Sequence, residues 1–374
     1  MNPFPLTAYH GPDYFCDRED ETRHLISNAL NGAHTTLISI RRMGKTILLK
    51  HVLNQLSKKR QVLCVYADIH ATLSQKDLLN QVSTAILQSI PDRKAISSKI
   101  LDFIKGLRPV ISYNTLTNQP ELSFDWQSPP MLEKSLQSLF QFLDKLDKTV
   151  VVAIDEFQQI ASYPETNTEA VLRSAIQPLK NVRFIFSGSS RHLLASMFAG
   201  SKRPFYGFSQ MTELSAIGTE AYAAFITRHF KAGKRKIDAA ALDFILQWTR
   251  RHTWFTQVLC NRLYADGQLL ISLPIVQSTA NRLLKEQEPV FFQYRSLLTS
   301  AQWQTLAAIA KEEKVYKPGA RDFLYKYRLG TPSSVKRSMD ALLEKEMILL
   351  NQDETGSFYQ VYDCFLSRWL EQVV

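Results

Sequence analysis

The chain has 374 residues and a mass of 42.8 kDa, a length that allows two or three domains. Hydrophobic residues make up 45% and charged residues 21% of the sequence, as in globular proteins, which excludes a chain that is disordered throughout. No run of about 18 uncharged apolar residues occurs, so we expect no membrane-spanning helix. The start lacks the basic and apolar stretches of a secretory signal, and the four cysteines show no metal-binding spacing, which favours a reducing cytoplasm.

The formal net charge is +10, and this excess is unevenly distributed. Residues 216–299 contain eleven basic and six acidic residues, whereas residues 300–374 contain ten of each. One dense cluster comprises Lys231, Lys234, Arg235 and Lys236. Such a cluster is either a solvated helix face or a site for a polyanion such as DNA or for another partner.

The first 215 residues alternate between two patterns, apolar residues at helical spacing and short continuous apolar runs. The first pattern predicts helices and the second predicts buried strands. The predicted helices are 17–30, 47–56, 78–90, 132–146, 169–179 and 191–198, and the predicted strands are 35–40, 62–67, 149–154 and 182–186. Two weaker runs, 109–113 and 121–124, predict a hairpin outside this alternation. The alternation predicts an α/β core, with a parallel sheet covered by helices on both faces.

The later part of the chain changes character twice. From residue 219 only helices are predicted, with no strand between them. From residue 300 three helices precede two short apolar runs, 348–350 and 358–361, that flank a polar turn; this is the order of a winged helix-turn-helix. We therefore predict three domains: a core at 1–215, a helical lid at 216–299 and a winged helix at 300–374.

The strongest local signal is the octapeptide SIRRMGKT, which begins at Ser39. It matches the P-loop pattern G-x-x-x-x-G-K-[ST] except that Ser39 replaces the first glycine, and it lies between a predicted strand and a predicted helix. A helix N-terminus in this position binds phosphate through its free N–H groups. Gly44 would let the backbone approach the phosphate oxygens, Lys45 would reach the β- and γ-phosphates, and the Thr46 hydroxyl would bind Mg²⁺.

A second signal is the strand VVVAI, which ends in Asp155 and Glu156. In P-loop ATPases the first acid of such a pair holds the metal ion and the second polarises the attacking water. Two adjacent acids at the end of a buried strand are costly unless a cation or hydrogen bonds compensate them. We therefore expect Asp155 to be a metal ligand together with Thr46, and Glu156 to be the general base.

A third strand ends in small hydroxyl residues, in the sequence FIFSGSS at 184–190. Ligands of parallel sheets gather at the carboxyl ends of the strands. Ser189, and secondly Ser187, could orient water or sense the γ-phosphate there. Equally, these serines could cap the helix that follows.

These motifs together resemble the prokaryotic STAND-type, AAA-like ATPases often called the archaeal ATPase family. The resemblance rests on an ordered set of motifs: DYFCDREDE from Asp13, SIRRMGKT, VVVAIDEF, FSGSS, KRPFYG from Lys202, WFTQ from Trp254 and VYDCF from Val361. It implies an ATPase core, a helical lid and a winged helix.

The resemblance also implies roles for further residues. The nucleotide-contacting set would comprise Tyr14, Phe15, Arg18, Arg41, Arg42, Met43, Gly44, Lys45, Thr46 and Ile47. Relatives often carry an arginine where this chain has Phe208, so Arg203 becomes the candidate for an arginine that acts on a neighbour's nucleotide, with Arg173 and Arg191 as rivals. A nucleotide-sensing residue is expected at 253–257, with His252 as another candidate.

The expected function is that of an ATP-driven conformational switch that binds ATP or ADP with Mg²⁺ and hydrolyses ATP slowly. The winged helix would either bind DNA, with Lys336 and Arg337 near the start of its recognition helix, or interact with a protein partner or a second copy of the chain. The equal numbers of acids and bases in residues 300–374 favour a protein partner. A nucleotide-binding scaffold without useful turnover is the remaining alternative.

Overall fold

The computed structural model describes residues 2–89, 110–113, 120–123 and 129–373. The chain forms two compact units, residues 7–215 and residues 216–374 together with residues 1–6. Among the described helices, none combines the length and apolar character needed to cross a bilayer.

A five-stranded parallel sheet forms the centre of the first unit, with the strand order β2–β5–β6–β1–β7. Its strands are β1 (Thr35–Ile38), β2 (Val62–Asp68), β5 (Thr149–Asp155), β6 (Val182–Gly188) and β7 (Gln210–Glu213). Four of these were predicted, and the fifth, β7, adds an edge beside β1. The order places the carboxyl ends of β5, β6 and β1 next to one another, which is where parallel sheets bind ligands.

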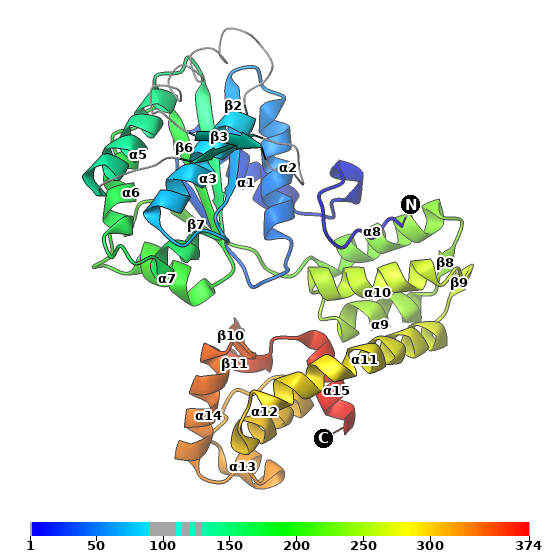
Figure 1. Cartoon of the computed structure of the whole chain (residues 1–374). Coiled ribbons are helices and arrows are strands. Elements are labelled where there is room, and N and C mark those ends of the chain that lie inside the picture. The colour runs from blue at the N-terminus through cyan, green and yellow to red at the C-terminus, as the bar shows by residue number, and fades with distance from the viewer. Residues whose placement is uncertain (1, 90–109, 114–119, 124–128, 374) are drawn as a thin grey trace. The chain divides into compact units, whose positions relative to one another are not determined.

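Helices cover this sheet in two groups on opposite sides (Figure 1). They are α1 (Glu19–Leu30), α2 (Lys45–Ser57), α3 (Gln75–Gln88), α5 (Pro129–Asp144), α6 (Thr168–Ile176) and α7 (Arg191–Ala199). Helices α1 and α2 pack together, whereas α3 and α6 both pack against α5. Because both faces are covered, β5 is buried from Val150 to Asp155, which explains its continuous apolar run. The predicted α/β fold is confirmed.

The predicted hairpin is also present. Strands β3 (Val110–Tyr113) and β4 (Pro120–Ser123) pair antiparallel. The outer ends of the two predicted runs, at positions 109 and 124, lie outside the described residues.

The second unit begins with a helical layer. It contains α8 (Thr219–Ala232), α9 (Ala239–Trp248), α10 (Thr253–Ala265) and α11 (Leu273–Ser296). Residues 2–6 pack into this layer, where the fully buried Phe4 ring lies 5.2 Å from the ring of Phe230.

The expectation that no strand interrupts these helices was wrong. Strands β8 (Lys236–Ile237) and β9 (Leu270–Ile271) form a parallel pair in this layer. Two residues are too few to show alternation in a sequence, which is why this pair escaped prediction.

The rest of the unit has helix, helix, helix and a two-stranded wing, in the predicted order. Its elements are α12 (Ser300–Glu312), α13 (Arg321–Tyr327), α14 (Pro332–Glu344), β10 (Ile348–Asp353), β11 (Gly356–Val361) and α15 (Cys364–Val373). The predicted cap of α14 is present, because the Thr331 hydroxyl accepts a hydrogen bond from the N–H of Ser334.

Arg250, in the turn between α9 and α10, ties the helical layer to the winged helix. Its guanidinium donates to the carbonyl of Val361 and to the hydroxyl of Ser367, both at 2.8 Å, and forms an ion pair with Glu313. From α15, Arg368 reaches the same Glu313 carboxylate and the carbonyl of Trp248. The layer and the winged helix are therefore joined by a charged network.

Candidate active site

The phosphate-binding loop lies between β1 and α2, as predicted. Gly44 adopts φ 90° directly before the first residue of α2, a left-handed conformation that glycine takes without strain. Ser39, at the position of the first P-loop glycine, is fully buried, and its hydroxyl donates to the carbonyl of Ile40 at 3.0 Å. The loop therefore accommodates serine at this position by turning the hydroxyl onto its own backbone.

Lys45 and the two acids at the end of β5 converge. The Lys45 ammonium donates to Asp155 Oδ1 at 2.8 Å and to Glu156 Oε1 at 3.0 Å. The Thr46 hydroxyl donates to Asp155 Oδ2 at 2.6 Å. Lys45 and Asp155 are 6% and 1% exposed, so this pair lies in the protein interior. The structure thus brings both predicted motifs into one site.

Two further groups donate to Asp155. The Ser187 hydroxyl at the end of β6 reaches Oδ1, and the Tyr66 hydroxyl of β2 reaches Oδ2 at 3.1 Å. Tyr66 was not predicted, because a tyrosine within a strand gives no local signal. Only the pairing of β2 with β5, which aligns Asp68 with Asp155, places it here.

Glu156 has a separate set of partners. Its Oε2 accepts from the Ser189 hydroxyl at 2.9 Å and from the amide of Gln158. Ser189 therefore lies beside the acid pair at the end of β6. It donates to Glu156, whereas Ser187 donates to Asp155. Gln158 was missed, since a glutamine beside an acid pair is a common surface pattern.

Lys45, Asp155 and Glu156 stabilise one another's charged forms although burial disfavours them. Burial by itself would lower the pKa of Lys45, but the two carboxylates outweigh burial and raise the pKa. Burial likewise would raise the pKa of Asp155 and of Glu156, but the Lys45 charge and the hydrogen bonds keep both pKa values below their usual range. All three groups are therefore ionised at neutral pH.

The groups in this site are suited to bind a nucleotide together with a metal ion. A carboxylate and a hydroxyl oxygen, from Asp155 and Thr46, are the kind of ligands that Mg²⁺ takes in nucleotide sites. The first turn of α2 supplies free N–H groups next to Lys45 for phosphate oxygens. A hydrogen-bonded Glu156 beside them has the chemistry of a general base.

The remaining predicted loop residues have different environments. Arg41 and Arg42 are exposed, whereas Met43 is buried in the core and Ile47 is half-buried. Met43 is therefore placed as a packing residue of the loop.

The three predicted nucleotide-contacting residues before α1, Tyr14, Phe15 and Arg18, have different surroundings. Phe15 stacks on the His51 ring with centroids 4.0 Å apart, and the Tyr14 ring lies 6.0 Å from that of His10. Arg18 is buried and donates to Glu21 at 2.8 Å and to the carbonyl of Ser215 at 2.6 Å. Arg18 thus fixes the end of the first unit.

The three candidate arginines have partners within the core. Arg203 pairs with Glu169 and Arg191 with Glu213, while the Arg173 guanidinium lies 3.9 Å from the centre of the Phe208 ring. His252 is buried in the second unit against the ring of Phe255.

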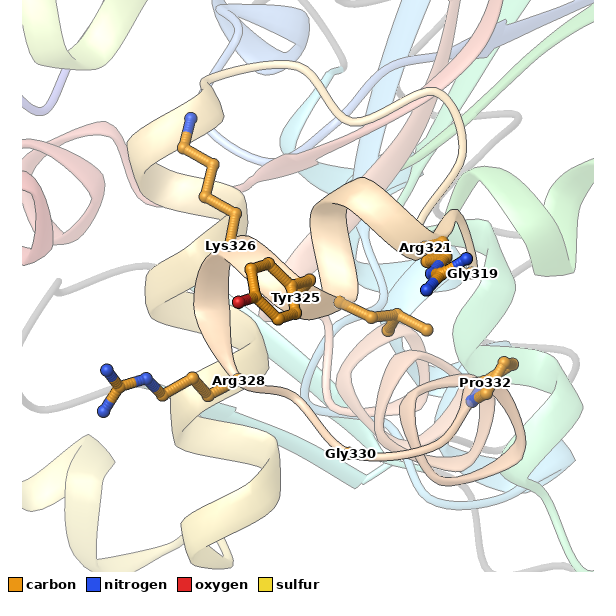
Figure 2. Close-up of a pocket in the computed structure, with 8 residues that line it drawn as sticks. Gly319, Arg321, Tyr325, Lys326, Arg328, Gly330 and Pro332 are labelled. Atoms are coloured by element: carbon orange, nitrogen blue, oxygen red, sulfur yellow. The ribbon is translucent and has the colours of Figure 1, made fainter.

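The winged helix carries a second candidate site on the face formed by α13 and the start of α14, called here the α13–α14 face. Arg321, Tyr325, Lys326 and Arg328 line its pocket, and the exposed Lys336 and Arg337 follow near the start of α14. Lys326 forms an ion pair with Glu312. A pocket of about 750 Å³ opens on this face, and Figure 2 shows Tyr325 between Arg321 and Arg328. Tyr325 is 87% exposed. Within the described part of the chain, neither of these two arginines forms an ion pair.

The basic cluster of the helical layer is arranged differently. Arg235 lies over the ring of Tyr264 and donates to its carbonyl, whereas Lys231, Lys234 and Lys236 are exposed. One of the four cations is thus a structural residue.

Comparisons with known proteins agree with this architecture. Residues 30–196 match the family described as an AAA domain, and residues 289–372 match one described as a probable winged helix domain. No curated protein sequence matches the chain.

Three solved structures have similar folds over nearly the whole chain. The Walker-type ATPase PABY2304 of Pyrococcus abyssi has a TM-score of 0.67 at 18% identity, covering 98% of this chain and 99% of that one. The ORC2 protein of Aeropyrum pernix, solved in ADPNP–ADP complexes, has 0.59 at 13%, covering 99% and 96%. The A. pernix ORC1 protein in complex with DNA has 0.51 at 13%, covering 100% and 96%.

At 13–18% identity these structural similarities show a shared fold only. The two family matches identify two regions of the chain. The chain therefore contains an AAA domain, matched over residues 30–196, and a C-terminal winged helix domain, matched over residues 289–372, within a fold like that of a Walker-type ATPase.

Proposed function

We propose that the chain binds ATP with Mg²⁺ at the P-loop site, hydrolyses it slowly, and acts as a conformational switch of the STAND type. The observation that carries this proposal is the convergence of Lys45, Asp155 and Glu156 within 3.0 Å in the interior of the core. Thr46 and Asp155 would hold the magnesium ion, which would offset the charge of the phosphates.

The expectation of slow ATP hydrolysis is based on the contacts of the candidate arginines Arg203 and Arg191. Rapid phosphoryl transfer usually needs an arginine that stabilises the transition-state charge. Arg203 and Arg191 are each engaged by a carboxylate of the core. An arginine from a second copy of the chain, or from another partner, would then set the rate.

The two units join in the sequence at Ser215 and Ala216. Arg18 donates to the carbonyl of Ser215 in the first unit, and in the second unit Arg251 donates to Thr219 at 2.9 Å and to the carbonyl of Ile217 at 3.5 Å. These contacts fix the backbone on each side of the junction within its own unit. Loss of the γ-phosphate would remove contacts made in one state only and so would change the preferred conformation of the chain.

Mg-ATP binding to the purified full chain tests the proposal. Lys45→Ala removes the ammonium for the phosphates and is expected to weaken binding about 100-fold, as for the loss of two charge-assisted hydrogen bonds. Lys59→Ala, an exposed lysine just beyond α2, is the matched control and leaves binding unchanged. Equal, negligible binding by wild type and Lys45→Ala contradicts the proposal. ATP binding with phosphate release at background indicates the scaffold alternative.

For the winged helix we propose duplex DNA as the partner. Residues 300–374 contain equal numbers of acids and bases, but not all of the cations are neutralised within the protein. Arg321 and Arg328 are exposed and form no ion pair among the described residues, and Lys336 and Arg337 are exposed near the start of α14. In helix-turn-helix proteins the start of the recognition helix, which corresponds to α14 here, contacts DNA, and exposed cations neutralise phosphates.

DNA binding measured at several salt concentrations tests this second proposal. The wild type should bind with an affinity that falls steeply as salt increases, and Lys336→Glu/Arg337→Glu should lose this binding. Binding that is absent, or insensitive to salt, would instead support the protein-partner alternative.

A further inference from the structure

Gln158 has an unusual position for a residue outside the predicted motifs. It lies in the short helix η2 (Phe157–Ser162) that follows β5. Its amide nitrogen donates to Glu156 Oε2 and lies 3.5 Å from the Ser189 hydroxyl, which donates to the same oxygen. The other oxygen of Glu156, Oε1, accepts from Lys45 instead. The two oxygens of this carboxylate therefore have separate partners.

Two features of the Gln158 amide are energetically or sterically demanding. The amide oxygen is buried without a hydrogen-bond partner in the described structure, which is unfavourable for a polar atom. The amide oxygen also occupies the space beside Gly188, where a Cβ would lie 1.9 Å from it. An alanine at 188 would therefore displace the end of the Gln158 side chain, and its Cβ would also lie 2.8 Å from a methyl carbon of Leu194. The Gln158 amide is therefore held by its contact with Glu156 although its own oxygen lacks a partner in the described structure.

We propose that Gln158 is a positioning residue for Glu156. It fixes Oε2 against Ser189, so that only Oε1 changes partner during the reaction cycle. This inference rests on the proposed ATPase function and adds a residue to it.

The chemistry assigns a task to each oxygen. Lys45 donates to Oε1, and this bond competes with a proton for that oxygen. When Lys45 turns to the phosphates, Oε1 is free to accept a proton from water. The water oxygen then forms a bond to the γ-phosphorus as the bond to the ADP oxygen breaks, giving ADP and phosphate. Throughout, Gln158 and Ser189 hold Oε2, and so set the direction in which Oε1 points.

Steady-state ATP hydrolysis by the full chain tests the inference with Gln158→Leu. We expect kcat to fall about tenfold, as for the loss of roughly one orienting hydrogen bond, with KM within about twofold of wild type. The neighbouring Gln159 lies in the same short helix, but its amide donates to the carbonyl of Thr72. Gln159→Leu is therefore the matched control, and its kcat stays near the wild-type value.

Two further variants separate positioning from a general structural effect. In a Glu156→Gln background the residue that Gln158 positions is no longer a base, so Gln158→Leu should lower the residual rate less than about twofold. Gly188→Ala should displace the Gln158 amide and lower kcat about as much as Gln158→Leu. Adding Gln158→Ala to Gly188→Ala should cause no further loss.

The outcomes distinguish this inference from the function on which it rests. Hydrolysis that depends on Lys45 but is equally fast in the Gln158→Leu and Gln159→Leu variants overturns the role of Gln158 alone. The same conclusion follows if Gln158→Leu lowers the rate as much in the Glu156→Gln background as in the wild type. Hydrolysis that does not depend on Lys45 overturns the proposed function and this inference together.

Discussion

The P-loop site and the α13–α14 face use similar groups in opposite ways. In the core, Lys45, Asp155 and Glu156 are buried or half-buried, and each charge has partners within hydrogen-bond distance. On the winged helix, Arg321 and Arg328 are exposed and form no ion pair within the described residues. Paired buried charges fix a geometry, whereas exposed charges without a protein partner remain available to an external anion.

This difference predicts how each region responds to salt and to mutation. Charges in the interior interact across a medium of low polarity and are little affected by ions in solution. Exposed charges are screened beyond roughly 8–10 Å at physiological ionic strength. Removing one buried partner should therefore destabilise the fold, whereas removing an exposed arginine should affect only binding.

The largest expected effect is that of Asp155→Leu. This change leaves Lys45 with a single carboxylate and deprives the hydroxyls of Thr46, Tyr66 and Ser187 of their acceptor. Breaking a buried pair in this way costs about 3–5 kcal/mol of unfolding free energy. Urea denaturation of the core, followed with and without the change, measures it. Asp147→Ala, at an exposed position, is the control, and equal stability of the two variants would remove the basis of the comparison.

His34 gives the next effect, because it is half-buried and the described charges that act on it are those of arginines. Burial, followed by the charges of Arg183 and Arg173, lowers its pKa from 6.5 to about 4. The neutral ring accepts a hydrogen bond at Nδ1 from the N–H of Phe184, at 3.0 Å. The unfolded chain therefore binds more protons than the folded chain between pH 4 and 6.5, and stability rises with pH in that window. The contribution is complete above pH 6.5 and is lost as the pH falls towards 4.

His34→Asn tests this effect, since its amide oxygen can accept the same hydrogen bond but does not titrate. The difference in unfolding free energy between wild type and variant should shift by up to about 3 kcal/mol between pH 7 and pH 4. Parallel pH profiles for the two proteins would show that His34 does not titrate in this range.

The core and its site were largely predictable because their signals are local. The P-loop and the acid pair each lie within eight consecutive residues, and continuous apolar strands place them at one edge of a parallel sheet. Tyr66 and Gln158 were not predictable in this way. The role of Tyr66 depends on the register of β2 against β5, and that of Gln158 on the space left by Gly188 on β6.

The second unit was less predictable for a related reason. Helix α11 is 24 residues long, begins Leu-Pro and contains Pro289, a residue that normally ends a helix. No sequence pattern predicts that Phe4 packs against α8 and α10, because this depends on the three-dimensional arrangement of the aromatic rings of Phe225 and Tyr264. Long-range packing of this kind has no local period.

Arg250 represents an intermediate case between the two regions. Its side chain is 14% exposed, and it has three partners, of which Glu313 is 45% exposed. Arg250→Ala should lower the unfolding free energy of the second unit by about 2 kcal/mol. The neighbouring Arg251→Ala, which loses contacts to Thr219 and to the carbonyl of Ile217 only, serves as a comparison for differential scanning calorimetry. An equal loss in both variants would mean that the network around Glu313 adds nothing to stability.

The smallest effect on stability, and the clearest on binding, is expected for Arg321→Ala. The side chain is exposed and lines the pocket beside Tyr325, so its loss should change the unfolding free energy by less than about 0.5 kcal/mol. If it neutralises one DNA phosphate, the slope of log affinity against log salt should become shallower by about 1. Lys311→Ala, an exposed cation on α12 outside the α13–α14 face, controls for net charge. A slope that changes equally in both variants would mean that DNA responds to the overall charge of the unit and does not occupy this face. A shallower slope in Arg321→Ala alone would locate the phosphate contact at the pocket of Figure 2.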